Sequence, residues 1–186
     1  MPRKTRVIEP NTVYHVYNRR NDRQVLFPSA RSRDAFVDLM DEGRTGYRIA
    51  ICMYCVMETH WHQGIWVRDL REVTAVARYV QWLSSRHATR FRVVTGTRGN
   101  GHVYQDRYKS KPVETPEYYV TLNRYIEANP LDAGLVKRAE DWRWSSLAER
   151  TSGRPRIISD GPVPLPDNWV EIVNRKSDFD DYLMLA

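Results

Sequence analysis

Cysteine and long apolar runs are scarce in this chain of 186 residues. Two cysteines cannot form the disulfide framework that stabilises small secreted domains. The longest apolar stretch, residues 49–57, is too short to span a bilayer. The basic residues 1–6 lead into no apolar segment of the kind that a secretory signal requires. We therefore expect neither a membrane protein nor a disulfide-rich secreted domain, and we expect a cytoplasmic location.

Lysine is also scarce, although the chain is basic. Only 5 of its 29 Lys and Arg residues are Lys, and the formal net charge is +6. The arginine guanidinium pairs with two phosphate oxygens or with a guanine edge, and it stacks on bases. This composition, with 11 Tyr and 6 Trp, favours a nucleic-acid partner. An arginine-rich surface that only contacts solvent has the same composition, so charge alone leaves both interpretations open.

Five segments have the residues of β-strands. Residues 12–18, 47–57 and 61–67 are rich in β-branched and aromatic side chains. Two shorter strand-like segments, residues 102–105 and 107–113, follow a loop rich in glycine. The short connection between the second and third strands predicts that they pair as a hairpin.

Four segments have the apolar spacing of helices. A serine cap predicts a helix over residues 29–42 that ends at two glycines, and a second helix covers residues 70–91. A Thr-Pro-Glu start predicts a third helix from residue 115, which should stop near residue 129 because Pro130 disfavours helical geometry before it. A further helix is predicted over residues 139–150.

The order of these elements predicts the architecture. It fits an α+β, ferredoxin-like sandwich in which one antiparallel sheet has helices packed on one face, with a C-terminal helical extension. We expect residues 1–150 to form the catalytic domain. Residues 151–186, which begin with a stretch rich in Gly, Pro and Ser, should form a linker and a tail that docks on the same domain.

His60 and His62 flank Trp61 at the start of a predicted strand. Alternate residues of a strand share one face, so the two imidazoles can converge on one metal ion while Trp61 packs on the other face. Two histidines with this spacing also occur by chance. Cys52 and Cys55 precede them with the spacing of a zinc site. Positions i and i+3 of a strand point to opposite faces, however, so we favour small core residues over a zinc site.

Tyr125 and Asn129 lie four residues apart on the predicted third helix and therefore share a face. Tyr118 lies near that face two turns earlier. Each residue alone also fits a structural role, Tyr125 as a half-buried aromatic and Asn129 as the last residue before a proline.

Several segments together resemble a known family. Residues 57–62, 124–136 and 142–146, supported by residues 14–19 and 105–109, resemble the single-tyrosine HUH transposases with an IS200-like domain. The resemblance is greatest to the REP-associated tyrosine transposases. The chain departs from the family at two places: Glu58-Thr59 replaces the usual Pro-Asn before the first histidine, and Arg20 occupies a position that often carries a small residue.

The resemblance implies a role for each of four residues. His60, His62 and Asn129 would bind Mg²⁺ or Mn²⁺, and Tyr125 would be the nucleophile. The implied enzyme is a metal-dependent endonuclease and strand transferase that cuts single-stranded DNA at palindromic, REP-like hairpins through a 5′-phosphotyrosine link. A monomer is favoured, and a dimer stays open.

Two rival functions stay open as well. One is a protein that binds DNA hairpins without cutting them, and the other is a metal-dependent phosphoesterase. If the protein binds DNA, whether or not it cuts it, basic side chains near the N-terminus and in the glycine-rich loop are candidates for DNA contacts. These candidates are Arg3, Lys4, Arg6, Arg19, Arg20, Arg23 and Arg98.

Overall fold

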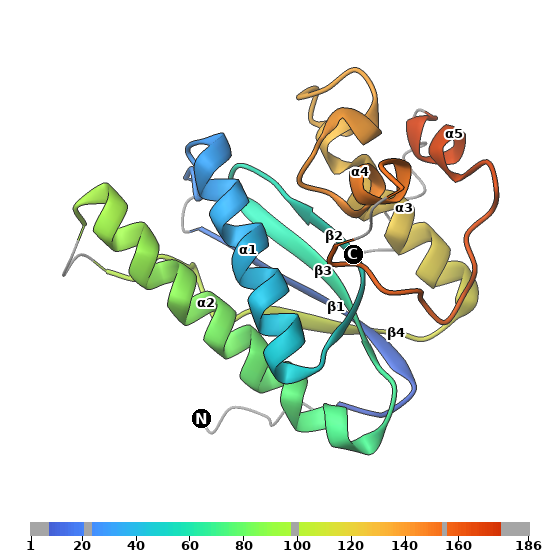
Figure 1. Cartoon of the computed structure of the whole chain (residues 1–186), viewed down its shortest axis with the longest axis horizontal. Helices are drawn as coiled ribbons and strands as arrows, with labels where there is room; N and C mark the ends of the chain where they lie inside the picture. Colours follow the sequence, from blue (N-terminus) through green and yellow to red (C-terminus); the bar gives the residue numbers. More distant parts are fainter. Residues whose placement is uncertain (1–7, 21–23, 98–100, 154–155, 176–186) are drawn as a thin grey trace.

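The computed structural model describes residues 8–20, 24–97, 101–153 and 156–175 (Figure 1). One four-stranded sheet, in the order β2-β3-β1-β4, organises the fold. All its pairs are antiparallel. Its strands are β1 (Thr12–Arg19), β2 (Ala50–Val56), β3 (His60–Val67) and β4 (Lys109–Val113). This strand order confirms the predicted α+β, ferredoxin-like fold.

Helices α1 (Ala30–Tyr47) and α2 (Val73–Thr95) cover one face of the sheet. They lie side by side in Figure 1. A short 3-10 turn, η2 (Leu70–Glu72), precedes α2. The main core lies between these helices and the inward side chains of the strands, among them Trp61, which is fully buried.

Helix α1 is longer than predicted, because Gly43 does not end it. A Cβ atom at Gly43 would lie 2.6 Å from the Trp82 ring and 2.7 Å from the Tyr79 ring of α2. The glycine is therefore a point of close approach between two helices. The helix ends instead at Arg48, which has a left-handed φ of 56°.

The opposite face of the sheet is covered by α3 (Pro116–Asp132). Two shorter helices, α4 (Ser146–Thr151) and α5 (Trp169–Asn174), pack beside α3. The predicted packing of helices on one face holds for α1 and α2, and α3 adds a second layer on the other face. Every residue of β2 is buried, which requires cover on both faces of that strand. The continuous apolar sequence of β2 was the signal for this second layer.

Helix α3 continues past Pro130, so the predicted stop at residue 129 is wrong. Pro130 lies in the last turn, where its missing N–H removes only the hydrogen bond to the carbonyl four residues earlier. The helix then closes at Gly134, which has φ of 68°. The Leu135 N–H donates to the Pro130 carbonyl and the Gly134 N–H to the Leu131 carbonyl. Asn129 consequently stays in regular helix, one turn after Tyr125.

The predicted helix over residues 139–150 is divided in two. A 3-10 turn, η3 (Ala139–Asp141), and α4 are separated by non-helical residues 142–145, which include a turn and a single β-bridge to β2. Among these residues, the Trp144 carbonyl accepts from the Val56 N–H, and the Trp142 indole donates to the Val56 carbonyl. Pairing with the β2 edge therefore replaces helix formation there.

Residues 156–175 pack against both layers. Ile157 joins the core beneath α1 and α2, and the Ser159 N–H donates to the Ile51 carbonyl. Trp169 and Val173 of α5 join a small core with Ala128 of α3. None of the helices in the described ranges is long and apolar enough to cross a membrane.

A buried histidine, His87 of α2, gives the fold a predictable response to acid. It packs against Phe27 and Phe36, and its Nδ1 lies 2.9 Å from the Tyr104 hydroxyl. Burial, with a smaller effect of Arg90, lowers its pKa to about 3. The unfolded chain therefore takes up a proton below pH 6.5 that the folded chain does not, and stability falls as the pH falls from 6.5 toward 3.

We expect His87→Leu to reduce this acid sensitivity. Between pH 7 and pH 4.5, the wild type should lose about 2–3 kcal/mol more unfolding free energy than the variant. Urea unfolding at the two pH values measures the difference. Equal losses in the two proteins would contradict this assignment.

Candidate active site

His60 and His62 lie on the face of β3 that α3 covers, and Trp61 lies on the opposite face. The two imidazole centroids are 4.9 Å apart, and their planes are nearly perpendicular at 87°. The alternation of side chains along β3 therefore brings the two histidines together, as their spacing predicts.

Tyr125 approaches the two histidines from α3. Its ring centroid lies 5.7 Å from that of His62, at an interplanar angle of 81°. Asn129 follows one turn later, and its side-chain Nδ2 donates to the Tyr125 carbonyl at 3.2 Å. Burial lowers the pKa of His60, and the nearby Asn129 side chain partly opposes this fall. The four predicted residues thus meet on one face of the sheet.

Each of the two imidazoles is held through its Nδ1 atom. The Thr59 hydroxyl lies 2.9 Å from His60 Nδ1, and His15 Nε2 lies 2.8 Å from His62 Nδ1. The remaining nitrogen of His62, Nε2, is buried and has no hydrogen-bond partner within the described part of the chain. This nitrogen is therefore available to a ligand in the site.

Burial keeps these imidazoles neutral. It lowers the pKa of His62 well below 6.5, and the nearby His60 and His15 lower it further. Burial also lowers the pKa of His60, against the opposing effect of Asn129. The pKa of His15 falls to about 3 through burial and the charge of Lys111. Neutral imidazoles have the free electron pair that a metal ion requires.

The donor set fits a divalent cation. Two imidazole nitrogens and the amide oxygen of Asn129 can bind Mn²⁺ or Mg²⁺ and leave positions for water and phosphate oxygens. The orphaned Nε2 of His62 is the observation that favours such a ligand. No cluster of three or more His, Cys, Asp or Glu suited to a metal occurs in the described ranges.

Glu58 and Thr59, where the chain departs from the family pattern, form a turn that packs against residues 26 and 27 and contacts the first histidine. The Glu58 carbonyl accepts from the N–H groups of Leu26 and Phe27 at 2.8 and 2.9 Å. Thr59 supplies the hydroxyl that contacts His60 Nδ1. The two residues thus anchor the turn and orient the first histidine.

We predicted no role for His15 or Tyr17 from the sequence. Their rings stack at 4.7 Å, and both rings contact His62. Burial and the nearby Tyr125 raise the pKa of Tyr17. The sequence predicted only that these residues lie on a strand. Their contact with the candidate site follows from the register, which pairs Tyr17 with His62.

Basic side chains of β1 and β4 lie next to the candidate site. In the register, Arg19 lies opposite His60, and Lys109 lies opposite Tyr17. Lys109 Nζ is 5.9 Å from the Tyr17 ring centroid, and Arg19 Nε donates to the Gln105 side chain at 2.5 Å. A cavity of about 260 Å³ opens here. It is lined by Tyr17, Asn18, Arg19, Gln105, Asp106, Arg107 and Lys109.

Arg20, another predicted DNA contact, forms contacts within the protein. It donates to the Val25 carbonyl at 2.6 Å, and its guanidinium lies 4.8 Å from the Phe91 ring centroid. The remaining candidates lie outside the described residues. They are Arg3, Lys4, Arg6, Arg23 and Arg98.

Cys52 and Cys55 face the same side of the sheet, so the prediction that they point to opposite faces is wrong. The register passes from Ile51–Ile65 to Met53–Gly64, and Cys52 is the extra residue of a β-bulge. Cys52 Sγ lies 3.9 Å from the Asp160 carbonyl, whereas Cys55 Sγ lies 3.6 Å from Met57 Sδ. Both are free, and burial raises the pKa of each thiol, that of Cys52 to about 12. They are core residues, as we favoured.

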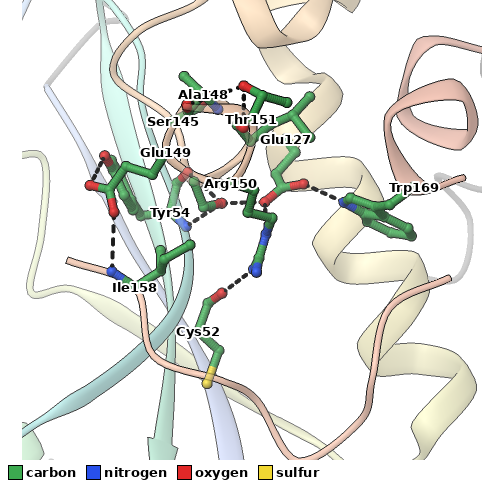
Figure 2. A network of polar contacts seen from close by, with 12 residues as sticks. Cys52, Tyr54, Glu127, Ser145, Ala148, Glu149, Arg150, Thr151, Ile158 and Trp169 are labelled. Atoms are coloured by element: carbon green, nitrogen blue, oxygen red, sulfur yellow. Dashed lines mark hydrogen bonds and ion pairs between the residues drawn. The ribbon is translucent and has the colours of Figure 1, made fainter. Parts of the chain in front are cut away.

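A buried carboxylate, Glu127, fixes the helix that carries Tyr125 (Figure 2). One oxygen accepts from the Ser146 hydroxyl and from Arg150 Nε, and the other accepts from the Trp169 indole at 2.6 Å. Arg150 also donates to the Cys52 carbonyl. Glu127 thereby joins α3 to α4, α5 and β2. We did not predict it from the sequence, although its place between Ile126 and Ala128 in the interior of the helix was a signal.

We expect Glu127→Ala to lower the free energy of unfolding by about 3–5 kcal/mol, because it leaves Arg150 Nε and the Trp169 indole without their acceptor. Chemical denaturation measures the loss. Glu171→Ala, which removes an exposed carboxylate from α5, is the matched control and should have little effect. Equal stability of the two variants would show that the buried network does not hold α3.

The fold and the site define a class of protein: an α+β sandwich in which two strand-borne histidines face a tyrosine on a helix. The family model described as "Transposase IS200 like" matches residues 9–129, more than half of the chain. The chain therefore belongs to the IS200-like transposase family, as its sequence predicts.

A solved structure supports the fold. The chain is similar to a REP-associated tyrosine transposase bound to a REP hairpin, with a TM-score of 0.59 and 19% sequence identity. The alignment covers 90% of this chain and 96% of that one. Among proteins of curated function, none matches this sequence.

Proposed function

We propose that this protein is a metal-dependent endonuclease and strand transferase that acts on single-stranded DNA at palindromic, REP-like hairpins. The observation that carries the proposal is the contact between the Tyr125 ring and His62, whose buried Nε2 is unpartnered within the described residues. Membership of the IS200-like family supports the same chemistry.

His60, His62 and Asn129 would hold Mg²⁺ or Mn²⁺. When bound there, the ion would polarise the scissile phosphate and stabilise the departing 3′-oxygen. Hydrogen bonds within the chain orient these three side chains. Thr59 and His15 fix the two imidazoles, and Asn129 is fixed by the hydrogen bond from its amide nitrogen to the Tyr125 carbonyl. That bond leaves the amide oxygen of Asn129 to act as a donor atom.

Tyr125 would be the nucleophile. Its phenolic oxygen forms a bond to phosphorus, and the bond from phosphorus to the 3′-oxygen breaks. The phenolic proton passes to water, and the departing 3′-oxygen takes a proton from water. The phenolic proton leaves as the new bond forms. The products are a 5′-phosphotyrosine link and a 3′-hydroxyl end. Because one phosphodiester replaces another, attack by a second 3′-hydroxyl rejoins the strand by the reverse reaction.

The DNA strand would cross the β1–β4 half of the sheet. Arg19 and Lys109 are exposed beside the histidines, Lys111 lies opposite His15, and Tyr17 offers an aromatic face between them. Cations and aromatic rings in this arrangement hold single strands through phosphates and bases. The similar transposase of known structure is described as bound to a REP hairpin, which supports the same kind of DNA here.

We further propose that one chain suffices, because Tyr125 contacts His62 of its own chain. Residues 1–150 would form the catalytic unit, with residues 151–186 as a tail docked on it. The packing of α5 against α3 supports this division.

Incubation with a single strand that carries a palindrome, in the presence of Mn²⁺, tests the proposed function. We expect a protein–DNA adduct that survives denaturing electrophoresis and disappears when EDTA is present. Hairpin binding without cleavage would instead favour a binding protein. Cleavage of small phosphoesters without an adduct would favour a phosphoesterase.

A further inference from the structure

A third histidine, His15 of β1, contacts His62, one of the two histidines expected to bind the metal. It is only 6% exposed, and its Nε2 lies 2.8 Å from His62 Nδ1. The His15 and His62 rings are nearly parallel, with centroids 5.1 Å apart and an angle of 24°. The Tyr17 ring stacks on His15 at 4.7 Å and also contacts His62 at 5.6 Å, so the three rings form one cluster. His15 is therefore fixed by contacts with two aromatic neighbours.

The hydrogen bond between the two rings determines where each proton lies. If His62 binds a cation through Nε2, its Nδ1 carries the proton and donates it to His15 Nε2. His15 is then the acceptor and carries its own proton on Nδ1. Since His15 Nε2 is directed at His62, it is not available as a further ligand. Thr59 provides the equivalent acceptor for His60.

We infer that His15 is a positioning residue: it holds His62 in the tautomer and orientation that present Nε2 to the divalent cation. The inference rests on the proposed metal site. Partners that orient a ligating histidine typically change metal affinity 10–100-fold when removed. The partner in this chain is a neutral imidazole supplied by the neighbouring strand.

Three variants of the full chain separate this role from simple core packing. His15→Leu removes the acceptor, whereas His15→Gln keeps a side-chain oxygen that can accept from His62 Nδ1. His87→Leu is the matched control, because His87 is an equally buried histidine that contacts Tyr104 on the other side of the sheet. Mn²⁺ binding is measured by electron paramagnetic resonance, and folding by circular dichroism.

We expect His15→Leu to weaken Mn²⁺ binding about 10–100-fold. His15→Gln and His87→Leu should bind Mn²⁺ nearly as the wild type does. DNA cleavage by His15→Leu should recover when the Mn²⁺ concentration is raised. Wild-type affinity in folded His15→Leu would overturn the inference, and so would an equal loss in folded His15→Leu and His15→Gln.

Nuclear magnetic resonance of the wild type tests the same inference without a variant. In the Mg²⁺-saturated protein, the ¹⁵N spectrum should show the His62 proton on Nδ1, and a proton on Nε2 would overturn the inference. Failure of the proposed function gives a different result. In that case His62→Ala binds Mn²⁺ as tightly as the wild type. If His62→Ala loses binding while His15→Leu keeps it, only the role of His15 fails.

Discussion

Tyr125→Phe is expected to abolish covalent capture of DNA, by at least about a thousandfold, while hairpin affinity stays nearly unchanged. The change removes one oxygen atom, the proposed nucleophile, and keeps the ring that contacts His62. Adduct formation on denaturing gels measures the first quantity, and gel-shift titration of a hairpin measures the second.

Tyr118→Phe is the matched control for this variant. Tyr118 lies on the same helix, two turns before Tyr125, and its pKa is raised by burial and by Tyr17. The control should form the adduct as the wild type does. If Tyr125→Phe still cuts DNA while no adduct forms in either protein, water rather than tyrosine is the nucleophile, and the phosphoesterase alternative gains support.

His62→Ala is expected to remove Mn²⁺ binding, with affinity lower by more than about 100-fold, and to abolish cleavage with it. Loss of this side chain takes away one donor atom and leaves His15 Nε2 without its partner. Isothermal titration with Mn²⁺ measures the affinity. His102→Ala, at an exposed histidine, is the control and should bind Mn²⁺ normally. Equal Mn²⁺ affinity of the two variants would show that the metal binds at another site.

The pH dependence of this binding has a predictable sign. Burial lowers the pKa of both His60 and His62 below 6.5, so protons compete with the metal only at lower pH. We expect Mn²⁺ affinity to change little between pH 7.5 and pH 6.5. A steep loss over that interval would indicate that the imidazoles titrate near the value of a free histidine.

Local patterns predicted the parts of the site that depend on one element. The alternation of β3 placed His60 and His62 on one face, and the helical spacing of α3 kept Tyr125 and Asn129 together. Both patterns depend on backbone geometry alone, which explains why they hold in the structure.

Features that depend on two elements could not be predicted in the same way. The contact of His15 with His62 requires the register between β1 and β3, and the close approach at Gly43 requires the packing of α1 on α2. The β-bulge at Cys52 reverses the expected direction of a side chain. The face that α3 covers also follows from tertiary packing, because its own sequence does not specify a side of the sheet.

The proposed mechanism requires DNA to become attached to the phenolic oxygen of Tyr125. Mass spectrometry of peptides from the trapped protein–DNA adduct identifies the residue that carries the DNA. We expect a 5′-phosphonucleotide on Tyr125, in the peptide that also contains Asn129. Attachment to Tyr17 or Tyr118, or cut strands that carry free 5′-phosphates and no peptide, would contradict this mechanism.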